Sequence, residues 1–323
     1  MGRIFSYATL TGLGLLILAL IALPLMLGAL WIKVLTSAAI FALAAAGVAL
    51  VYAQLGLINL AQIALIGVGG WIALRLNYAT DLPVTLLVLI AGTLTGVIGA
   101  IFALPALRMR GLYLALVTLM VAALFQIFFN AFQFPNGGEG FWGVAQKSAS
   151  EVRRPGFAES DVGYYRYTLI FMAIGFGVIG LHKITAPGRA WAMIRQSEAN
   201  AMATGVNVTL YKLWAFALSG LLAGTAGALL AGALGQLDAR SFLAGEGILL
   251  FALAVVGGVF SWVGAIVAGL LYKLLPALFN DLGLSADVAM IIFGAALMHA
   301  IMTAPQGIAG QILGAFNRGG SDD

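Results

Sequence analysis

Long apolar segments recur along the whole chain, and this recurrence constrains the fold more than any other feature of the sequence. A helix needs about 20 apolar residues to cross a hydrocarbon core roughly 30 Å thick. Segments that meet this length, or nearly meet it, are residues 8–32, 34–52, 63–76, 83–107, 111–133, 167–182, 213–235, 246–280 and 286–304. Of the 323 residues, 9% are charged and 62% are hydrophobic, against about 25% and 45–50% in soluble domains. The sequence therefore predicts an all-α integral membrane protein, a polytopic helical bundle of about 8–10 spans that forms a single transmembrane domain over residues 1–323.

Two of these segments are irregular. Residues 63–76 are short for a span, and they follow the polar, glycine-containing stretch 52–62. Residues 246–280 are too long for one span and are interrupted by glycine and serine between positions 257 and 264. Irregular backbone at membrane depth survives only where it is buried in protein or lines a cavity. We therefore expect broken or re-entrant helices, with a helix pair that folds back within residues 246–280.

Basic residues predict the orientation of the chain. The turn that holds Arg108 and Arg110 and the connection 184–212 are the clearest basic loops, and such loops stay on the cytoplasmic side. Counting spans outward from them places both termini inside and residues 134–166 outside, as an extracytoplasmic loop. The apolar run 8–32 is longer than the 7–15 residues, roughly, of a signal-peptide core, so we interpret it as a retained first span.

One glycine pattern occurs twice. The spacing of Gly92, Gly96, Gly99 and Ala100 recurs at Gly220, Gly224, Gly227 and Ala228. The predicted layout runs the two helices in opposite directions, as in the inverted repeats that many transporters contain. Two independent helix-packing faces would give the same pattern, and the sequence leaves both interpretations open.

The chain has few groups that could carry out chemistry. It contains no cysteine, and its two histidines, His182 and His299, are far apart and outside any metal-ligand spacing. We expect each histidine to be a helix-end or packing residue, with no catalytic residues and no metal site. No glycine is followed by lysine, so the chain has no P-loop for ATP. The net charge of +4 is typical of basic cytoplasmic loops and does not indicate nucleic acid. Active transport would therefore draw its energy from another chain.

The most informative polar segment lies between two predicted spans. Pro187 suits the first turn of a helix and Gly205 suits its left-handed end. We expect one helix between them, with Trp191, Ile194 and Met202 on or near its apolar side and with Arg195 and Glu198 spaced to pair at i, i+3. Such a helix could dock into a groove of a partner protein or lie as an amphipathic linker on the membrane surface.

Several short motifs, taken together, resemble a known family. They are Gly56–Gln62, Leu104–Thr118, Gly188–Ala199, Gly205–Asn207, Tyr211–Lys212, Gly257–Gly258 and Ala304–Gly307. In their order and spacing, over residues 40–310, the chain resembles the membrane permease subunit of ABC importers for branched-chain amino acids and related solutes. The early polar segment departs from the family's usual Ser-Leu-Gly-Gln, since this chain has Asn59-Leu-Ala-Gln62, and Ala304 precedes Pro305 where arginine is frequent.

The resemblance implies a division of labour in the bacterial inner membrane. Such a permease pairs with a second, homologous permease, two cytoplasmic ATPases and an extracytoplasmic solute-binding protein. The partner ATPases would bind ATP and magnesium, and this chain would hold no cofactor. Segment 184–212 would carry the coupling helix, which seats on an ATPase. The residues that the resemblance assigns to ATPase coupling are Gly188, Arg189, Arg195, Glu198, Ala199, Gly205 and Asn207.

The amides of Gln54, Asn59 and Gln62 are the candidates for the substrate pathway. Uncharged amides can hydrogen-bond a small polar solute without trapping it, and a nearby half-helix terminus could meet a carboxylate. These amides could equally satisfy broken backbone groups inside the bundle. Two other functions stay open from the residues alone: a self-sufficient homo-oligomeric channel or facilitator, and an intramembrane enzyme that uses a histidine.

Overall fold

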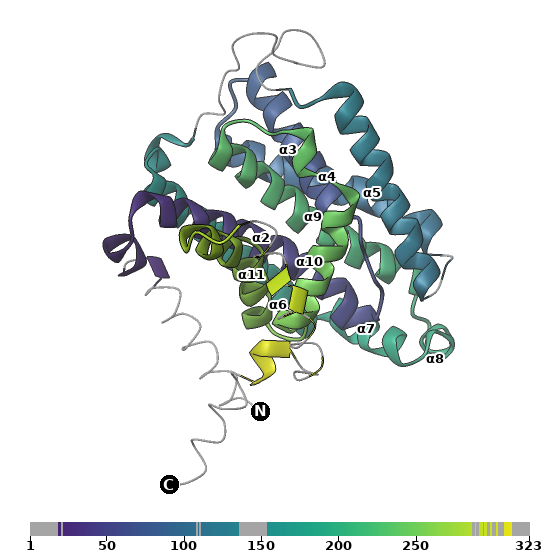
Figure 1. Cartoon of the computed structure of the whole chain (residues 1–323). Helices are drawn as coiled ribbons and strands as arrows, with labels where there is room; N and C mark the ends of the chain where they lie inside the picture. Colours follow the sequence, from purple (N-terminus) through teal and green to yellow (C-terminus); the bar gives the residue numbers. More distant parts are fainter. Residues whose placement is uncertain are drawn as a thin grey trace.

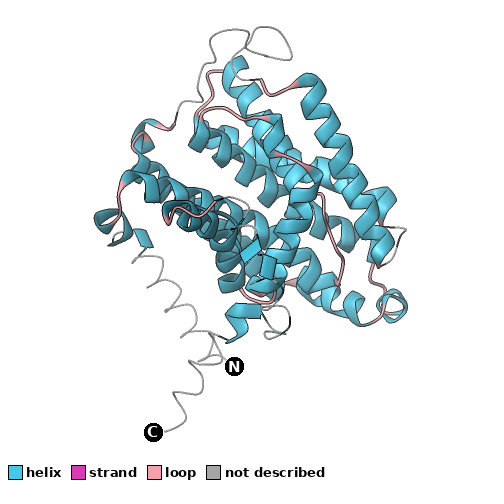
Figure 2. Ribbon diagram, in the orientation of Figure 1, coloured by secondary structure: helices cyan, strands magenta, loops and turns pink. Residues whose placement is uncertain are grey.

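The described part of the chain is a bundle of helices without strands (Figures 1 and 2). This computed structural model describes residues 19–20, 22–107, 109, 111–135, 154–285 and single or short stretches of residues between 288 and 311. Its helices are α2 (Ala29–Leu55), α3 (Gln62–Ala79), α4 (Val84–Ala106), α5 (Leu112–Phe132), α6 (Asp161–Ile184), α7 (Ala186–Gln196), α8 (Glu198–Ala203), α9 (Val208–Leu234), α10 (Ala244–Gly257) and α11 (Trp262–Asp281), with two 3-10 turns at Gly156–Ala158 and Ala239–Ser241.

Seven helices of the described chain are long and apolar enough to cross a bilayer, which confirms a multi-pass all-α membrane protein. Of these, α2 and α9 are the most enclosed: 83% and 78% of their apolar windows are buried, against 22–44% in the other five. α2 is apolar on every side, as a helix at the centre of a bundle must be. The outer helices α4, α5, α6 and α11 instead leave part of their apolar surface for lipid.

The recurring glycine pattern brings α4 and α9 into close contact. A methyl group added to Gly96 would lie 2.8 Å from the Ala217 carbonyl, and one on Gly220 would lie 3.1 Å from the Gly96 Cα. Gly92 packs further along α9, against Thr225, so the two helices are antiparallel. Small residues let membrane helices approach this closely. Part of the second copy, Gly220 and Gly224, therefore packs against the first, an arrangement that an inverted repeat would also produce; the repeat itself stays a prediction.

The third helix of this layer, α3, packs on the same glycine-lined face of α9, further toward the end of that helix. A methyl group on Gly69 would lie 2.3 Å from the Gly224 Cα, and one on Gly227 would lie 1.9 Å from the Ile66 carbonyl. No side chain fits between these backbones without moving one of them. One glycine-lined face of α9 therefore makes direct backbone contact with both α3 and α4.

The break predicted within residues 246–280 is present. α10 ends at Gly257, Gly258 adopts φ +113°, and Ser261 begins α11 by accepting a hydrogen bond from Gly264 N. A methyl group on Gly257 would lie 2.3 Å from the Gly264 carbonyl. The two helices therefore form a tight hairpin. α10 itself has 14 residues and is about 21 Å long. Together with the 3-10 turn before it, the apolar segment Ala239–Gly257 is one of the seven that are long enough to cross.

The span predicted at residues 167–182 was too short at its start. α6 begins at Asp161, six residues earlier, because Ser160 caps it by accepting a hydrogen bond from Gly163 N. The end of the predicted loop 134–166 is therefore helical. Arg154 connects the start of α6 to α9. Its guanidinium donates to the carboxylate of Asp161 at 2.8 Å and to the carbonyls of Gly232 and Ala233 at 3.3 Å.

Several sequence predictions fall outside the described residues. These are about half of the span 8–32, most of the span 286–304, the basic pair Arg108 and Arg110, most of the loop 134–166, and His299 with Ala304 and Pro305. His182 is described, and it packs between the rings of Trp191 and Trp214 with Nδ1 2.8 Å from the Val178 carbonyl. It is a packing residue at a helix end.

Candidate functional site

The predicted coupling helix is two helices. α7 ends at Gln196 and α8 begins at Glu198, because Ser197 adopts an extended conformation and caps α8 by accepting from Asn200 N. The expectation of one continuous helix was therefore wrong. α7 and α8 lie together at one end of the bundle (Figure 1), where they connect α6 to α9.

The inner face of α7 is anchored to the chain's own bundle. Trp191 is fully buried, Ile194 is 4% exposed, and the indole of Trp191 donates to the Tyr211 carbonyl at 2.8 Å. Gly188 sits so close to the end of α6 that a methyl group there would lie 2.2 Å from the Lys183 carbonyl. The apolar side of the segment therefore faces inward, whereas Met202, expected on that same side, is 58% exposed.

Arg195 and Glu198 also contact the bundle. The guanidinium of Arg195 donates to the Ala53 carbonyl at the end of α2 and lies 5.4 Å from the ring of Phe260, in the turn between α10 and α11. Glu198 accepts from Lys212 of α9 at 2.7 Å. The predicted Arg195–Glu198 pair assumed a continuous helix, and the ion pair that the structure gives Glu198 is with Lys212. The Tyr211–Lys212 motif was noticed in the sequence, but its role as the partner of Glu198 was missed.

The outer face of α7 and α8 is open. Arg189, Ala192, Met193 and Gln196 recur at helical spacing on one side of α7 and are all exposed, and Ala199 is exposed on α8. Gly205 and Asn207, predicted with them, shape the element: Gly205 ends α8 with φ +84°, and Asn207 caps α9 by accepting from Leu210 N at 3.0 Å. The structure therefore divides the predicted coupling residues into two sets. Arg189 and Ala199 lie on the exposed face, whereas the others contact the bundle or form the helix ends.

A buried amide joins three helices near the beginning of α3. Gln62 has no exposed surface; its Nε2 donates to the Ala44 carbonyl of α2 at 3.0 Å and to the Ser219 carbonyl of α9 at 3.3 Å. Its Oε1 accepts from the Ser219 hydroxyl at 2.9 Å. Gly47 leaves room for this amide, since a methyl group there would lie 2.4 Å from Nε2. Sequence reasoning identified Gln62 but missed Ser219, which appears in the sequence as an ordinary small residue of a span.

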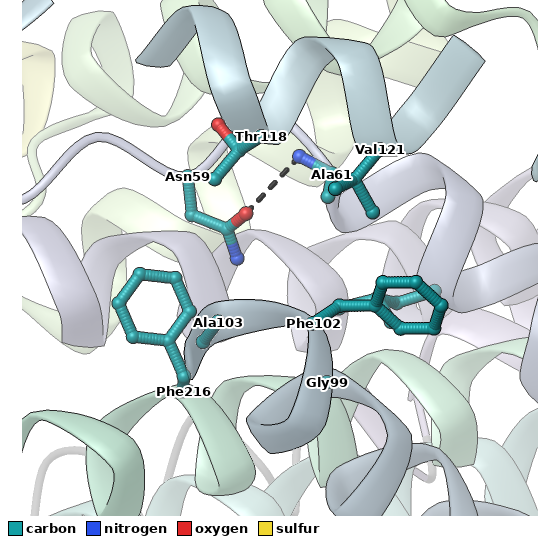
Figure 3. A pocket seen from close by; sticks show the side chains of 9 residues that line it. Asn59, Ala61, Gly99, Phe102, Ala103, Thr118, Val121 and Phe216 are labelled. Carbon is teal, nitrogen blue, oxygen red and sulfur yellow. Dashed lines mark hydrogen bonds between the residues drawn. The ribbon is translucent and has the colours of Figure 1, made fainter. Parts of the chain in front are cut away.

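Asn59 is 2% exposed, and it borders a small hollow beside this network. Its Oδ1 accepts from Ala61 N at 3.1 Å, and its side chain lies between Thr118 and the ring of Phe216 (Figure 3). The hollow has a volume of about 20 Å³, which holds about one water molecule and no amino acid. Gln54 lies apart at the end of α2 and is partly exposed. The structure thus places Asn59 and Gln62 together and Gln54 separately.

Comparison with known proteins gives one consistent result. Residues 30–301 match the family model described as the permease component of branched-chain amino acid transport systems. The chain is 26% identical over 314 residues to the high-affinity branched-chain amino acid transport system permease protein LivM of Escherichia coli K12, covering 91% of this chain and 73% of that protein. It is 25% identical over 316 residues to LivM of Salmonella typhimurium LT2, covering 92% and 73%. No solved structure matches the chain.

Proposed function

The chain belongs to the family of branched-chain amino acid transport permeases, and on this premise we propose that it forms the translocation pathway of an ATP-driven ABC importer for branched-chain amino acids or related small polar solutes. It is a multi-pass protein of the bacterial inner membrane with a transport permease role. Members of this family are components of transport systems, and the chain's own part in the proposed importer is passage of the solute, without catalysis.

The observation that carries this proposal is the two-sided structure of α7 and α8. One side is buried against α6 and α9 through Trp191 and Ile194, and the other presents Arg189, Ala192 and Met193 to the outside. A helix anchored on one face with an open, mixed polar and apolar face is suited to a partner's groove. The partner we propose is a cytoplasmic ATPase.

The anchored side provides a route for the ATPase motion into the spans. Arg195 contacts the end of α2 and the turn before α11. Trp191 and Glu198 form hydrogen bonds with Tyr211 and Lys212 of α9. Because α2 and α9 are the most enclosed of the apolar helices, a displacement of α7 and α8 would act on the centre of the bundle. Closely packed helices move as rigid bodies, so a displacement of one helix is passed to the helices that it contacts. In this proposal Arg195 and Glu198 transmit the motion, and the exposed face receives it.

The amides of Asn59 and Gln62 lie where α2, α3, α5 and α9 meet, close to the end of α2 that Arg195 contacts. In the conformation described, the adjacent hollow is too small for a solute. Passage there would need α3 and α9 to separate from α5. We propose that Gln54, Asn59 and Gln62 serve the pathway in this way, with Gln62 also closing the bundle between transport events.

The complete importer in this proposal contains further chains. A second homologous permease, two ATPases that bind ATP and magnesium, and an extracytoplasmic solute-binding protein would complete it. The proposal gives this chain no cofactor. The lipid bilayer surrounds the outward-facing sides of α4, α5 and α6.

One matched pair of substitutions tests the docking face. Ala192→Arg places a bulky cation on the exposed side of α7, and Ala79→Arg makes the same change on the exposed end of α3, at the opposite membrane surface in the predicted layout. We expect Ala192→Arg to abolish copurification of the ATPase and Ala79→Arg to leave it intact, with both variants inserted in the membrane. Retention of the ATPase by Ala192→Arg, or passive solute flux through the wild-type chain alone in liposomes, would contradict the proposal.

A further inference from the structure

Two opposite charges lie at the same depth in the hairpin of α10 and α11. Glu246 precedes Gly257, the end of α10, by eleven residues, and Lys273 follows Trp262, the start of α11, by eleven residues. At a rise of 1.5 Å per residue, each lies about 16 Å from the turn, near the middle of a hydrocarbon core about 30 Å thick. Ionisable groups at this depth are costly, and in membrane proteins they mark solute and ion pathways.

The hairpin and α2 place aromatic rings around these charges. The hydroxyl of Tyr272 donates to Glu246 Oε2 at 2.6 Å, and the ring of Tyr272 stacks on Phe41 of α2 with centroids 4.3 Å apart. The ammonium of Lys273 lies 4.6 Å from the centroid of Phe41 and 5.1 Å from that of Tyr272. Glu246, Tyr272 and Lys273 are each partly exposed. The charges therefore sit in an aromatic setting and keep part of their surface uncovered by the described bundle.

A purely structural role explains this arrangement incompletely. The bond from Tyr272 to Glu246 already joins α11 to α10, and it would need no cation nearby. The contacts of Lys273 with Phe41 and Tyr272 are with ring faces, which attract the charge but do not accept a directed hydrogen bond from the ammonium as a carboxylate would. N–H donors of Lys273 are thus left for a ligand. Glu246 likewise has a second carboxylate oxygen besides the one that Tyr272 occupies.

We propose that Lys273 and Glu246 form a subsite for a zwitterionic amino acid during its passage, with the lysine ammonium on the solute carboxylate and the glutamate carboxylate on the solute amino group. This inference rests on the proposed transport function and adds residues that the amide network does not include. The ring of Tyr272, which is partly exposed, would contact the apolar side chain, and the buried ring of Phe41 supports it from behind. Tyr52 lies eleven residues after Phe41 on the same side of α2 and meets Phe251 of α10 at 5.4 Å, so the aromatic surface continues toward the end of α2 that Arg195 contacts.

The test measures ligand binding to the complete permease–ATPase complex in nanodiscs, without the solute-binding protein. Radiolabelled leucine is displaced by three unlabelled compounds: leucine, isopentylamine, which lacks the carboxylate, and 4-methylpentanoate, which lacks the amino group. Lys273→Met is expected to weaken leucine and 4-methylpentanoate by about tenfold or more, the effect of losing one charge-assisted hydrogen bond, and to leave isopentylamine unchanged. Glu246→Gln is expected to weaken leucine and isopentylamine and to leave 4-methylpentanoate unchanged.

The control is Lys33→Met, which removes an exposed lysine at the start of α2 and should leave all three affinities unchanged. Lys273→Arg keeps the charge and should retain most of the leucine binding. Equal weakening of all three compounds by both variants, or no leucine binding by the wild-type complex at millimolar concentration, would overturn the subsite. If the ATPases copurify and transport leucine while the variants bind normally, this inference fails and the proposed function stands; if no ATPase associates, the proposed function itself fails.

Discussion

The ammonium of Lys212 lies 2.7 Å from the carboxylate of Glu198, and this ion pair joins the short helix α8 to the central helix α9. The side chain of Lys212 is 7% exposed and that of Glu198 is 32% exposed. The lysine is therefore buried with its charge compensated by a residue of the segment that connects α6 to α9. A rigid connection of this kind is what the proposed coupling needs.

Glu198→Gln should weaken both stability and coupling. It leaves the buried ammonium of Lys212 without its counter-charge, and because Glu198 is one-third exposed we expect a loss of about 1–3 kcal/mol, below the full cost of breaking a buried pair. The double variant Glu198→Gln/Lys212→Met should regain the melting temperature but not the transport per ATP hydrolysed. Thermal unfolding and proteoliposome uptake measure the two effects. Full recovery of transport in the double variant would show that the charge pair does not couple the helices.

Gln62→Leu should loosen the contact of α2, α3 and α9. Three hydrogen bonds between helices are lost, and at about 0.6 kcal/mol for each such bond in a membrane protein the expected loss is about 2 kcal/mol. The matched variant Gln54→Leu, at a partly exposed position, should leave the melting temperature unchanged and lower transport only. If both variants melt like the wild type, the network does not hold the bundle together.

Gly69→Ala should destabilise the protein by about 1–3 kcal/mol, because the added methyl group would overlap the backbone of α9 at Gly224. The matched control is Gly177→Ala in α6, where nothing lies within 4 Å of the new methyl group. That substitution should be neutral or stabilise the helix by up to about 1 kcal/mol. Melting temperatures of the two variants test this directly, and equal values would show that α3 and α9 are not packed as closely as described.

Arg154→Met should release the last turn of α9. The guanidinium no longer binds the carbonyls of Gly232 and Ala233 or the carboxylate of Asp161, and we expect a loss of about 1–3 kcal/mol. Hydrogen exchange of the amides near Gly235 should become faster. Lys33→Met removes the other cation beside Asp161, but that lysine is 64% exposed and 3.5 Å away, so its loss should cost less than about 1 kcal/mol. Unchanged exchange in Arg154→Met would mean that this contact does not stabilise α9.

The sequence predicted the spans well where apolarity alone decides them. The break at Gly257–Gly258 was predictable because 35 residues exceed one crossing and glycine with serine interrupts them. The start of α6 was placed late because its first turns are polar and aromatic. The continuous apolar pattern begins only after these turns. Ser160 followed by Asp161 was a usable N-cap signal for the true start.

The candidate site was less predictable, because the direction of a side chain is decided by packing. Ser197 with Glu198 is also an N-cap signal, but it lies inside a pattern that continues as a helix on both sides. Trp191 lies on the apolar face of an amphipathic segment. The sequence does not show whether that face packs on the chain's own bundle or on a partner. The partner of Glu198 depends on how α9 packs beside α8. The spacing of residues along one helix does not predict this packing.

The most direct test of the central claim, that the exposed face of α7 and α8 docks a cytoplasmic ATPase, uses the absence of native cysteine. Met193→Cys places a single thiol on that face, where the methionine is 38% exposed, and Phe157→Cys places one at a residue that is 76% exposed, before α6. A membrane-impermeant maleimide should label Met193→Cys only from the cytoplasmic side, and bound ATPases should protect it, while Phe157→Cys should react only from the outside whether or not ATPases are present. Labelling of Met193→Cys from the outside, or at the same rate with and without ATPases, would contradict the account.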